Sequence, residues 1–408
     1  MALPALPFFP LLCLLLFNQP SNAASAAANS PGRPYSARMA DSIILRGQAI
    51  AEQDADPSSL LQAGTFQTAL MDLIESPSAN YVEHDWASCI SRSVDSVVSV
   101  VDNAAEDTQF PLDRLSVGRG LLYQYGETGQ NIYRDSLAAL RTSIDLQPRN
   151  PFGGLWYYVY PNWSYLDGMF SLLSFYPLYT SNFDIGNTTE VNNDLFHQIE
   201  LLWEHCYDKT TGLLFHGYDA TKTASWANPT TGASPIVWDR AFGWFMMGLV
   251  DLLELPLKDS RVAKWRARFI DLANAVLTAV DPDSGCWWQV MSAPGRRGNY
   301  IEASGSAMFV YALYKGVRLG ILQDAGLQAN YTGVATRTYG SLVDRFVVDN
   351  RDGTLSYNGT VGVCSLNSTA TYEYYVQQPL VYDSVLGSAA FVRASVEHEL
   401  VHRTFDEA

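Results

Sequence analysis

Apolar residues recur at helical spacing along most of the chain, whereas alternation with period two is short wherever it occurs. Residues 239–254 and 259–279 have amphipathic or nearly all-apolar helical patterns. Another helix is predicted from Ser304, a plausible N-cap, through the positions Ala307, Met308, Tyr311, Ala312 and Tyr314. The pattern therefore predicts a mainly α-helical protein.

The predicted helices are separated by turns of one repeated kind, in which an Asp is followed by a Gly and a short strand-like segment. Three such turns contain Gly212, Gly285 and Gly353, which are 73 and 68 residues apart. This period fits a two-helix unit with long loops, and units that bury a face only against their neighbours form arrays. Six units would need roughly 420 residues, so six fit only with shorter early loops, and five is the numerical alternative. We predict one all-α toroid of helical hairpins, with short β-pieces in the loops, over residues 41–408.

The first residues have the features of a secretory signal. An apolar stretch from about Leu3 to Phe17 precedes polar residues and a small-x-small site that ends at Ala23. The stretch is short and broken by Pro, which does not favour a membrane span. Residues 1–23 are predicted to be a signal peptide and residues 24–40, rich in Ala, Ser and Pro, a disordered linker. A secreted, extracellular glycoprotein is also indicated by sequons at Asn187, Asn330, Asn358 and Asn367.

Composition narrows the classes of partner. The formal net charge is −16, and binding to nucleic acid needs a basic surface. The His residues are scattered, and HExxH, paired CxxC, phosphate-loop and Gly-x-Ser-x-Gly motifs are absent, so no metal site and no cofactor are expected. We predict a monomer with neither nucleic-acid nor membrane partners. Four cysteines could form two disulfides: Cys89, Cys206, Cys286 and Cys364. Cys89 and Cys206 could as easily be buried thiols in helices.

Two aspartates precede predicted helices in surroundings that suit acid–base chemistry. Asp167 follows an aromatic-rich loop, where a carboxyl group suits the role of a general acid. Asp113 lies ahead of the helix that begins at Gly118 and is a second candidate carboxylate. For both residues the alternative is a helix N-cap.

Further residues have the chemistry of a sugar site. His216 lies in a turn beside Gly and Tyr, where a His is a better ligand than on an apolar face. Arg240 and Trp244 are one helical turn apart and share a face, which would offer a guanidinium to a carboxylate and an indole to a sugar ring. The alternative is an ion pair between Arg240 and Asp239 that supports a core Trp. Glu302 precedes a helix that is as compatible with a core position as with a sugar platform.

Several segments match the motifs of one family in order, from about residue 60 to 395. Residues 238–244, WDRAFGW, and the LVDLLELP that follows are similar to WGRGNGW and LVDVLE-LP. Residues 298–312, GNYIEASGSAMFVYA, are close to GNYLEASGSAMFVYA. YPN and LDG within residues 160–168 and YEYYV at residues 372–376 also match. Together these segments resemble the unsaturated rhamnogalacturonyl hydrolases, glycoside hydrolase family 105.

The resemblance implies a six-hairpin (α/α)6 barrel and a substrate with a Δ4,5-unsaturated uronic acid at its non-reducing end. In the implied reaction an Asp protonates C4 of the vinyl ether and water adds at C5. The resulting hemiketal then opens and releases the rest of the sugar. By motif, Asp167 stands at the general acid/base and Asp113 at the second carboxylate. The resemblance implies as substrate-binding residues His216, Arg240, Trp244, Trp163 and Phe66.

The source of the substrate stays open at this stage. The leading interpretation is a secreted hydrolase that removes an unsaturated galacturonyl or glucuronyl group from rhamnogalacturonan (pectin) fragments. One alternative keeps the chemistry but takes unsaturated glucuronides from another polysaccharide. The alternative from a different class is a catalytically silent carbohydrate-binding toroid. Before its YPN motif the family often has a His, which is absent at Trp156-Tyr157.

Overall fold

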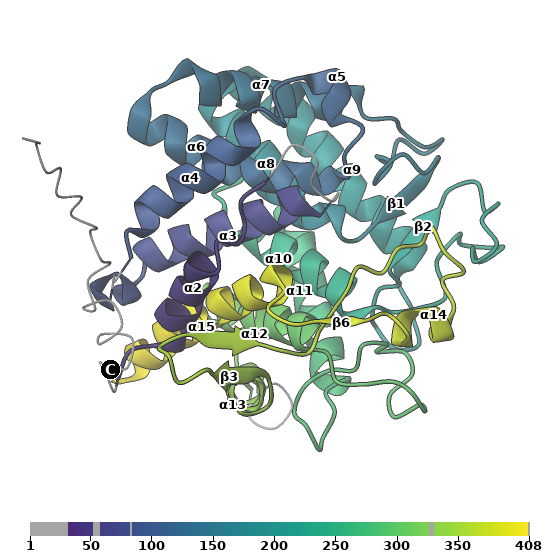
Figure 1. Cartoon of the computed structure of the whole chain (residues 1–408). Helices are drawn as coiled ribbons and strands as arrows, with labels where there is room; N and C mark the ends of the chain where they lie inside the picture. The colour runs from purple at the N-terminus through teal and green to yellow at the C-terminus, as the bar shows by residue number, and fades with distance from the viewer. Residues whose placement is uncertain (1–31, 52–57, 82–83, 326–329, 407–408) are drawn as a thin grey trace, which may run out of the picture.

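Helices make up the body of the molecule in the computed structural model, which describes residues 32–51, 58–81, 84–325 and 330–406 (Figure 1). The α-helices are α2 (Tyr35–Leu45), α3 (Ser59–Ile74), α4 (Trp86–Val98), α5 (Ala104–Asp107), α6 (Gly118–Thr128), α7 (Asn131–Leu146), α8 (Gly168–Phe183), α9 (Thr188–Cys206), α10 (Asp239–Glu254), α11 (Arg261–Thr278), α12 (Ala303–Arg318), α13 (Tyr331–Phe346), α14 (Tyr372–Val376) and α15 (Val385–Asp406). The 3-10 helices are η1 (Pro77–Tyr81), η2 (Leu112–Val117) and η3 (Ile185–Asn187). The predicted all-α class is confirmed.

The short strands form three antiparallel pairs within the described residues. They are β1 (Trp163–Tyr165) with β2 (Gly217–Asp219), β3 (Val347–Asp349) with β4 (Leu355–Tyr357), and β5 (Thr360–Val361) with β6 (Leu380–Val381). Strands β1 and β2 and helix α14 lie on the same side of the helical body (Figure 1). The β-pieces therefore belong to the loops, as the sequence predicts.

Six inner segments close into a ring within the described part of the chain. Helix α3 contacts the segment formed by η2 and α6, and this segment contacts α8. Helix α8 contacts α10, α10 contacts α12, and α12 contacts α15. Helix α15 contacts α3 and so closes the ring. Each inner segment also contacts an outer helix, namely α4, α7, α9, α11, α13 or α2. This is the (α/α)6 arrangement that the resemblance implies, and it decides the hairpin count in favour of six.

The burial pattern explains which helices lie inside. Helix α10 is buried at every position except Glu254, whereas α11 buries only one stripe that includes Trp265, Phe269 and Val276. A helix that is apolar all round belongs in a core, and an amphipathic helix covers one. Inner helices also approach closely, because a Cβ atom at Gly248 would lie 2.7 Å from the backbone oxygen of Met169.

The repeated turns have the predicted geometry. Gly212, Gly285 and Gly353 have φ angles of 76°, 70° and 96°, a region in which residues with a Cβ atom are strained. The N-cap prediction at Ser304 is wrong, because α12 starts one residue earlier and Glu302 accepts a hydrogen bond from the Gly305 N–H at 2.7 Å. Glu302 therefore has a structural role as a helix cap.

The N-terminal predictions are only partly open to comparison. The predicted signal peptide and residues 24–31 lie outside the described residues, but residues 35–40 of the predicted disordered linker belong to α2. That part of the prediction is wrong, because α2 buries an apolar face that includes Met39 and Ile43. Among the described helices none is long and apolar enough to span a membrane.

The cysteines are buried thiols, the alternative that the sequence left open for Cys89 and Cys206. Cys89, Cys206, Cys286 and Cys364 are free and buried. Cys89 lies in α4 and Cys206 is the last residue of α9, so each packs as a small apolar side chain.

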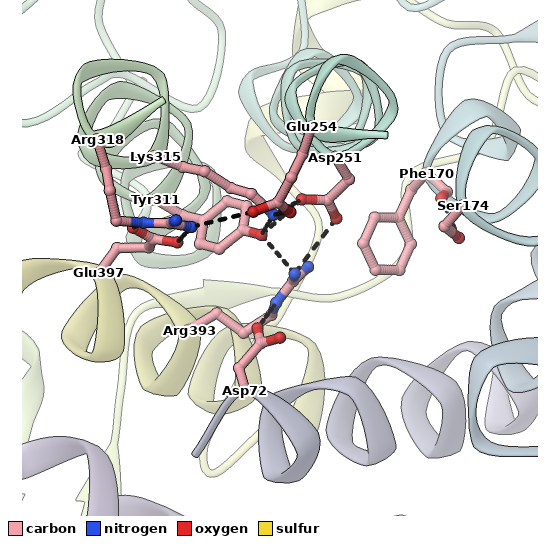
Figure 2. Close-up of polar contacts among 10 residues, drawn as sticks. All are labelled: Asp72, Phe170, Ser174, Asp251, Glu254, Tyr311, Lys315, Arg318, Arg393 and Glu397. Atoms are coloured by element: carbon pink, nitrogen blue, oxygen red, sulfur yellow. Dashed lines mark hydrogen bonds and ion pairs between the residues drawn. The ribbon is translucent and has the colours of Figure 1, made fainter. Parts of the chain in front are cut away.

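Charged side chains, among them the buried Asp251, Lys315 and Arg393, gather near the C-terminal ends of α10 and α12, in a cluster that we call the basal network (Figure 2). Its charged members are Asp72, Asp251, Glu254, Lys315, Arg318, Arg393 and Glu397. Asp251 accepts hydrogen bonds from Lys315 Nζ at 2.5 Å, from the Tyr311 hydroxyl at 2.6 Å and from Arg393 Nη2 at 3.2 Å. Arg393 Nε also donates to Asp72 at 2.6 Å. The basal network therefore ties together the inner helices α3, α10, α12 and α15.

Candidate active site

A cavity of about 330 Å³ contains both candidate carboxylates. Its lining comes from the starts of several inner helices and from the loops before them. The lining residues are Ser58, Leu61, Pro111, Asp113, Tyr157, Tyr158, Tyr160, Tyr165, Asp167, Trp238, Arg240, Trp244, Val363, Cys364, Ser365 and Leu386. A mainly aromatic wall with a few polar groups is typical of a site for a small ligand or a sugar ring.

Asp167 stands at the N-cap position of α8, but its side chain makes no capping hydrogen bond. Its backbone is in the helical region, with φ −53° and ψ −47°. Strand pairing places it, since Tyr165 pairs with Gly217 and the Leu166 N–H donates to the His216 carbonyl at 3.0 Å. The N-cap alternative is therefore correct for the position of Asp167 but not for its side chain, whose carboxylate is not used to cap the helix.

His216 is fully buried behind Asp167 and is not part of the cavity wall. Its Nε2 atom lies 3.1 Å from Asp167 Oδ2, and its Nδ1 atom lies 2.6 Å from the Tyr375 hydroxyl. Neither His216 Nε2 nor Asp167 Oδ2 has a hydrogen-bond partner within the described residues, so these two atoms meet as a close polar contact and not as a well-aligned hydrogen bond. The rings of Tyr165 and Trp238 pack against the imidazole at centroid distances of 5.1 and 4.9 Å. His216 therefore supports the carboxylate of Asp167.

Asp113 lies in η2 and is 5% exposed. The Tyr157 hydroxyl donates to its Oδ2 atom at 2.5 Å. Burial and the neighbouring charge of Asp167 raise the pKa of Asp113 to about 7, against the opposing effects of Tyr157 and Arg114. Pro111 holds the N-cap position of η2, so the N-cap alternative is wrong for Asp113. The two aspartates are close enough for their ionisation to be coupled.

Arg240 is 1% exposed and lies on the cavity wall. Its guanidinium donates to the carbonyls of Val361 at 2.5 Å and Gly362 at 2.6 Å, and it packs on the Trp238 ring with Cζ 4.8 Å from the centroid. A guanidinium has five N–H donors, so these bonds leave others for a ligand. The predicted alternative, an ion pair between Arg240 and Asp239, is not formed.

Asp239 is instead a neighbour of Glu302. Burial, the charge of Glu302 and a hydrogen bond with Glu302 hold the pKa of Asp239 well above its ordinary value. Glu302 also accepts from the Val361 N–H at 2.9 Å, and the Val361 carbonyl binds Arg240. Glu302 therefore supports the backbone segment that orients the guanidinium of Arg240, and Asp239 Oδ1 accepts a hydrogen bond from the Arg240 N–H at 2.8 Å.

The three predicted aromatic residues occupy different places. Trp244 lies on the cavity wall and packs on Phe170, with centroids 4.5 Å apart. Trp163 is outside the wall but packs on Tyr160, which is part of it, with centroids 5.4 Å apart. Phe66 does not reach the cavity: it is 3% exposed and belongs to the core around α3. Leu61, at the start of the same helix, lines the cavity instead.

The prediction from sequence missed several residues of the site. Tyr157, Tyr165 and Trp238 line the cavity, and Tyr375 holds His216. Trp238 and Tyr375 lie inside the matched motifs WDRAFGW and YEYYV, so the motifs contained a signal for both. Within the described ranges no group of three or more His, Cys, Asp or Glu side chains could hold a metal ion.

Comparison with known proteins identifies a family over nearly the whole folded chain. The family model of Glycosyl Hydrolase Family 88 matches residues 35–401. Protein Atu3128 of Agrobacterium fabrum is 36% identical over 198 residues, which are 47% of this chain and 84% of that protein.

Solved structures extend the likeness to the fold. A glycoside hydrolase from family 105 of C. acetobutylicum ATCC 824 superposes with a TM-score of 0.78 at 31% identity, covering 90% of this chain and 99% of the other. An unsaturated glucuronyl hydrolase of Bacillus sp. GL1 has a TM-score of 0.63 at 14% identity, covering 92% and 97% of the two chains. The second likeness shows the fold alone. The chain therefore belongs to the unsaturated uronyl hydrolases of glycoside hydrolase families 88 and 105.

Proposed function

We propose that this glycoside hydrolase removes a Δ4,5-unsaturated uronic acid from the non-reducing end of oligosaccharides, with Asp167 as general acid and base. The observation that carries the proposal is the pair of aspartates in one aromatic cavity. Asp113 and Asp167 both line that cavity, and the charge of Asp167 helps to raise the pKa of Asp113. Two coupled carboxyl groups can keep one proton near neutral pH.

The proposed reaction is hydration of the vinyl ether. Asp167 gives its proton to C4 while a water oxygen bonds to C5, and a proton from that water returns to Asp167. The product is a hemiketal at C5, which opens and releases the rest of the sugar without further help from the protein. Displacement at the anomeric carbon by a pair of carboxyl groups follows another route, so Asp113 is free to orient the water.

Binding of the uronate is assigned to the wall beside the aspartates. Arg240 is charged, is held by two carbonyls and lies on the cavity wall, where its remaining donors suit the uronate carboxylate. Trp244 offers an apolar face to the sugar ring. Trp163 lies one ring further out, beyond Tyr160, and suits the leaving sugar.

Rhamnogalacturonan fragments are the proposed substrate, because the motifs between residues 160 and 376 resemble those of the unsaturated rhamnogalacturonyl hydrolases. The alternative is an unsaturated glucuronide from another polysaccharide, because an unsaturated glucuronyl hydrolase of Bacillus sp. GL1 has the same fold. We also propose secretion. The apolar N-terminus supports it, as do the exposed sequon residues Asn187, Asn358 and Asn367.

Incubation with unsaturated disaccharides is the direct test. Substrates prepared with lyases from rhamnogalacturonan and from glucuronate-containing polymers should lose the ultraviolet absorbance of the conjugated double bond as the protein turns over. The ratio of kcat/KM between galacturonyl and glucuronyl substrates identifies the source. Absence of any loss across the panel would contradict the proposed activity and would favour a carbohydrate-binding toroid.

The pH dependence should have an alkaline limb near 7. The folded-state pKa of Asp113 is raised to about 7 by burial and by Asp167, so the coupled pair keeps a proton below that pH and loses it above. Because hydration needs a proton on the pair, kcat/KM should fall tenfold per pH unit above the limb. Asp113→Asn removes one carboxyl group of the pair and should shift the pH at which kcat/KM begins to fall. A profile that stays flat from pH 6 to 9 would argue against this assignment.

A further inference from the structure

Tyr157 has no role in the proposed reaction so far, although it touches one of the two aspartates. Its backbone is held on both sides: the N–H donates to the Trp163 carbonyl, and the carbonyl accepts from the Leu112 N–H, each at 2.8 Å. Leu112 directly precedes Asp113 in η2. The chain segment that supplies Tyr157 is therefore tied both to β1 and to the helix that supplies Asp113.

The ring of Tyr157 is held as firmly as its backbone. It stacks on Tyr165 with centroids 4.3 Å apart and ring planes 12° apart. Tyr165 in turn contacts the imidazole of His216, which faces Asp167. The phenol thus has little freedom to rotate away from its position beside Asp113.

The hydroxyl of Tyr157 binds only one of the two carboxylate oxygens of Asp113. Oδ2 accepts the phenol hydrogen bond at 2.5 Å. Oδ1 is buried and has no hydrogen-bond partner within the described residues. A buried carboxylate oxygen without a donor is costly, and this one belongs to a residue on the wall of the cavity. A water molecule in the cavity that displaced the atoms covering Oδ1 would satisfy it.

We propose that Tyr157 is a positioning residue of the hydration reaction, whose hydroxyl holds Oδ2 of Asp113 so that Oδ1 stays free to orient the reacting water. The inference rests on the proposed function and adds a residue to it. The phenol is a donor at every working pH, because burial of the hydroxyl and the charges of Asp113 and Asp167 hold the pKa of Tyr157 well above its ordinary value.

The charged groups around Asp113 set the direction of the expected pH effect. Asp167 faces it from the start of α8, Tyr157 from the loop before β1, and Arg114 from its own helix η2. Burial and Asp167 favour the protonated form of Asp113, whereas the Tyr157 hydrogen bond and Arg114 favour the ionised form. Loss of the phenol hydrogen bond therefore lets the pair keep its proton to a higher pH.

Tyr157→Phe tests the inference, because it keeps the stacked ring and removes only the hydroxyl. We expect kcat to fall about 10- to 100-fold, as for a lost hydrogen bond to a charged group, with little change in KM. The alkaline limb of kcat/KM should move upward by about one pH unit.

A matched control is available in Tyr133, whose hydroxyl donates to Asp95 at 2.7 Å away from the cavity. Tyr133→Phe removes the same kind of bond and should leave kcat and the pH profile unchanged. If Tyr157→Phe behaved like this control in an active enzyme, the positioning role would be wrong.

A measurement without substrate separates this inference from the proposed function. The carboxyl carbon of Asp113 can be followed by NMR in protein labelled with ¹³C-aspartate, and its midpoint should rise in Tyr157→Phe but not in Tyr133→Phe. An unchanged midpoint would overturn the inference whatever the activity. An inactive wild-type protein would instead overturn the proposed function.

Discussion

Asp167→Asn is expected to lower kcat by about 10³-fold or more, in the upper range of general acid–base contributions. The reason is that Asn cannot give a proton to C4 or take one from water, while its shape lets it occupy the same place. The melting temperature should stay close to that of the wild type, since the Asp167 side chain makes no capping bond to α8. The measurement is the loss of ultraviolet absorbance under saturating unsaturated disaccharide, together with a thermal melt.

The other end of the same helix supplies the control for this substitution. Asp184 is the C-cap residue of α8, far from the cavity wall, so Asp184→Asn should leave kcat unchanged. Turnover by Asp167→Asn within a few-fold of the wild type would show that another group transfers the proton. Asp113 would then be the first residue to test, because it is the second carboxyl group of the cavity.

Much of the fold was predictable because local rules and global packing agree. Turns at Gly212 and Gly285 need a positive φ that glycine provides, and continuous apolar helices such as residues 239–254 have to lie inside the ring. The first residues of α2 were wrongly assigned to the linker. This segment contains enough apolar side chains to pack on α15, but its pattern is too irregular to predict a helix. The hairpin count needed the family resemblance, since loop lengths vary along the chain.

The site was predictable where one segment contains the signal. Arg240 and Trp244 share a helix face, and both line the cavity. Contacts between distant segments left no local pattern: the Tyr375 hydroxyl meets His216 across 159 residues, and the Tyr157 hydroxyl meets Asp113 across 44. Phe66 packs in the core and does not line the cavity. Sequence could not distinguish the two places, because an aromatic side chain in an inner helix suits a hydrophobic core as well as a sugar site.

Asp251→Asn is expected to destabilise the protein by about 3–5 kcal/mol, which is typical when one partner of a buried ion pair is removed. Asp251 is 6% exposed and binds Lys315 and Arg393, whose side chains are buried as well (Figure 2). The loss would leave two buried cations with Glu254 and Asp72 as their remaining partners. In a chain of this size that corresponds to a fall in Tm of about 4–6 °C, because the entropy of unfolding is about 2 cal/mol/K per residue.

The destabilisation caused by Asp251→Asn should depend on pH in a defined direction. Burial alone would raise the pKa of the Asp251 carboxyl group, but the charges of Lys315 and Arg393 outweigh burial and hold this pKa well below its usual range. A carboxyl group with a depressed folded-state pKa stabilises the protein above its unfolded pKa of about 4 and loses that contribution as the pH falls further. The difference in Tm between wild type and Asp251→Asn should therefore be full at pH 7 and smaller at pH 3. An Asp251→Asn protein as stable as the wild type at pH 7 would contradict the prediction.

Asp145→Asn provides the matched control, since the Asp145 side chain is 59% exposed and pairs with Arg141 at the surface. Its removal should lower the free energy of unfolding by no more than about 1 kcal/mol.

The catalytic activity of Asp251→Asn should be unaffected, because the basal network and the cavity lie at different ends of α10. Arg240 and Asp251 lie 11 residues apart on α10, which is about 16 Å along a helix. Folded Asp251→Asn protein should therefore keep a near-normal kcat at a temperature well below its Tm, because the basal network holds the inner helices together without touching the cavity wall.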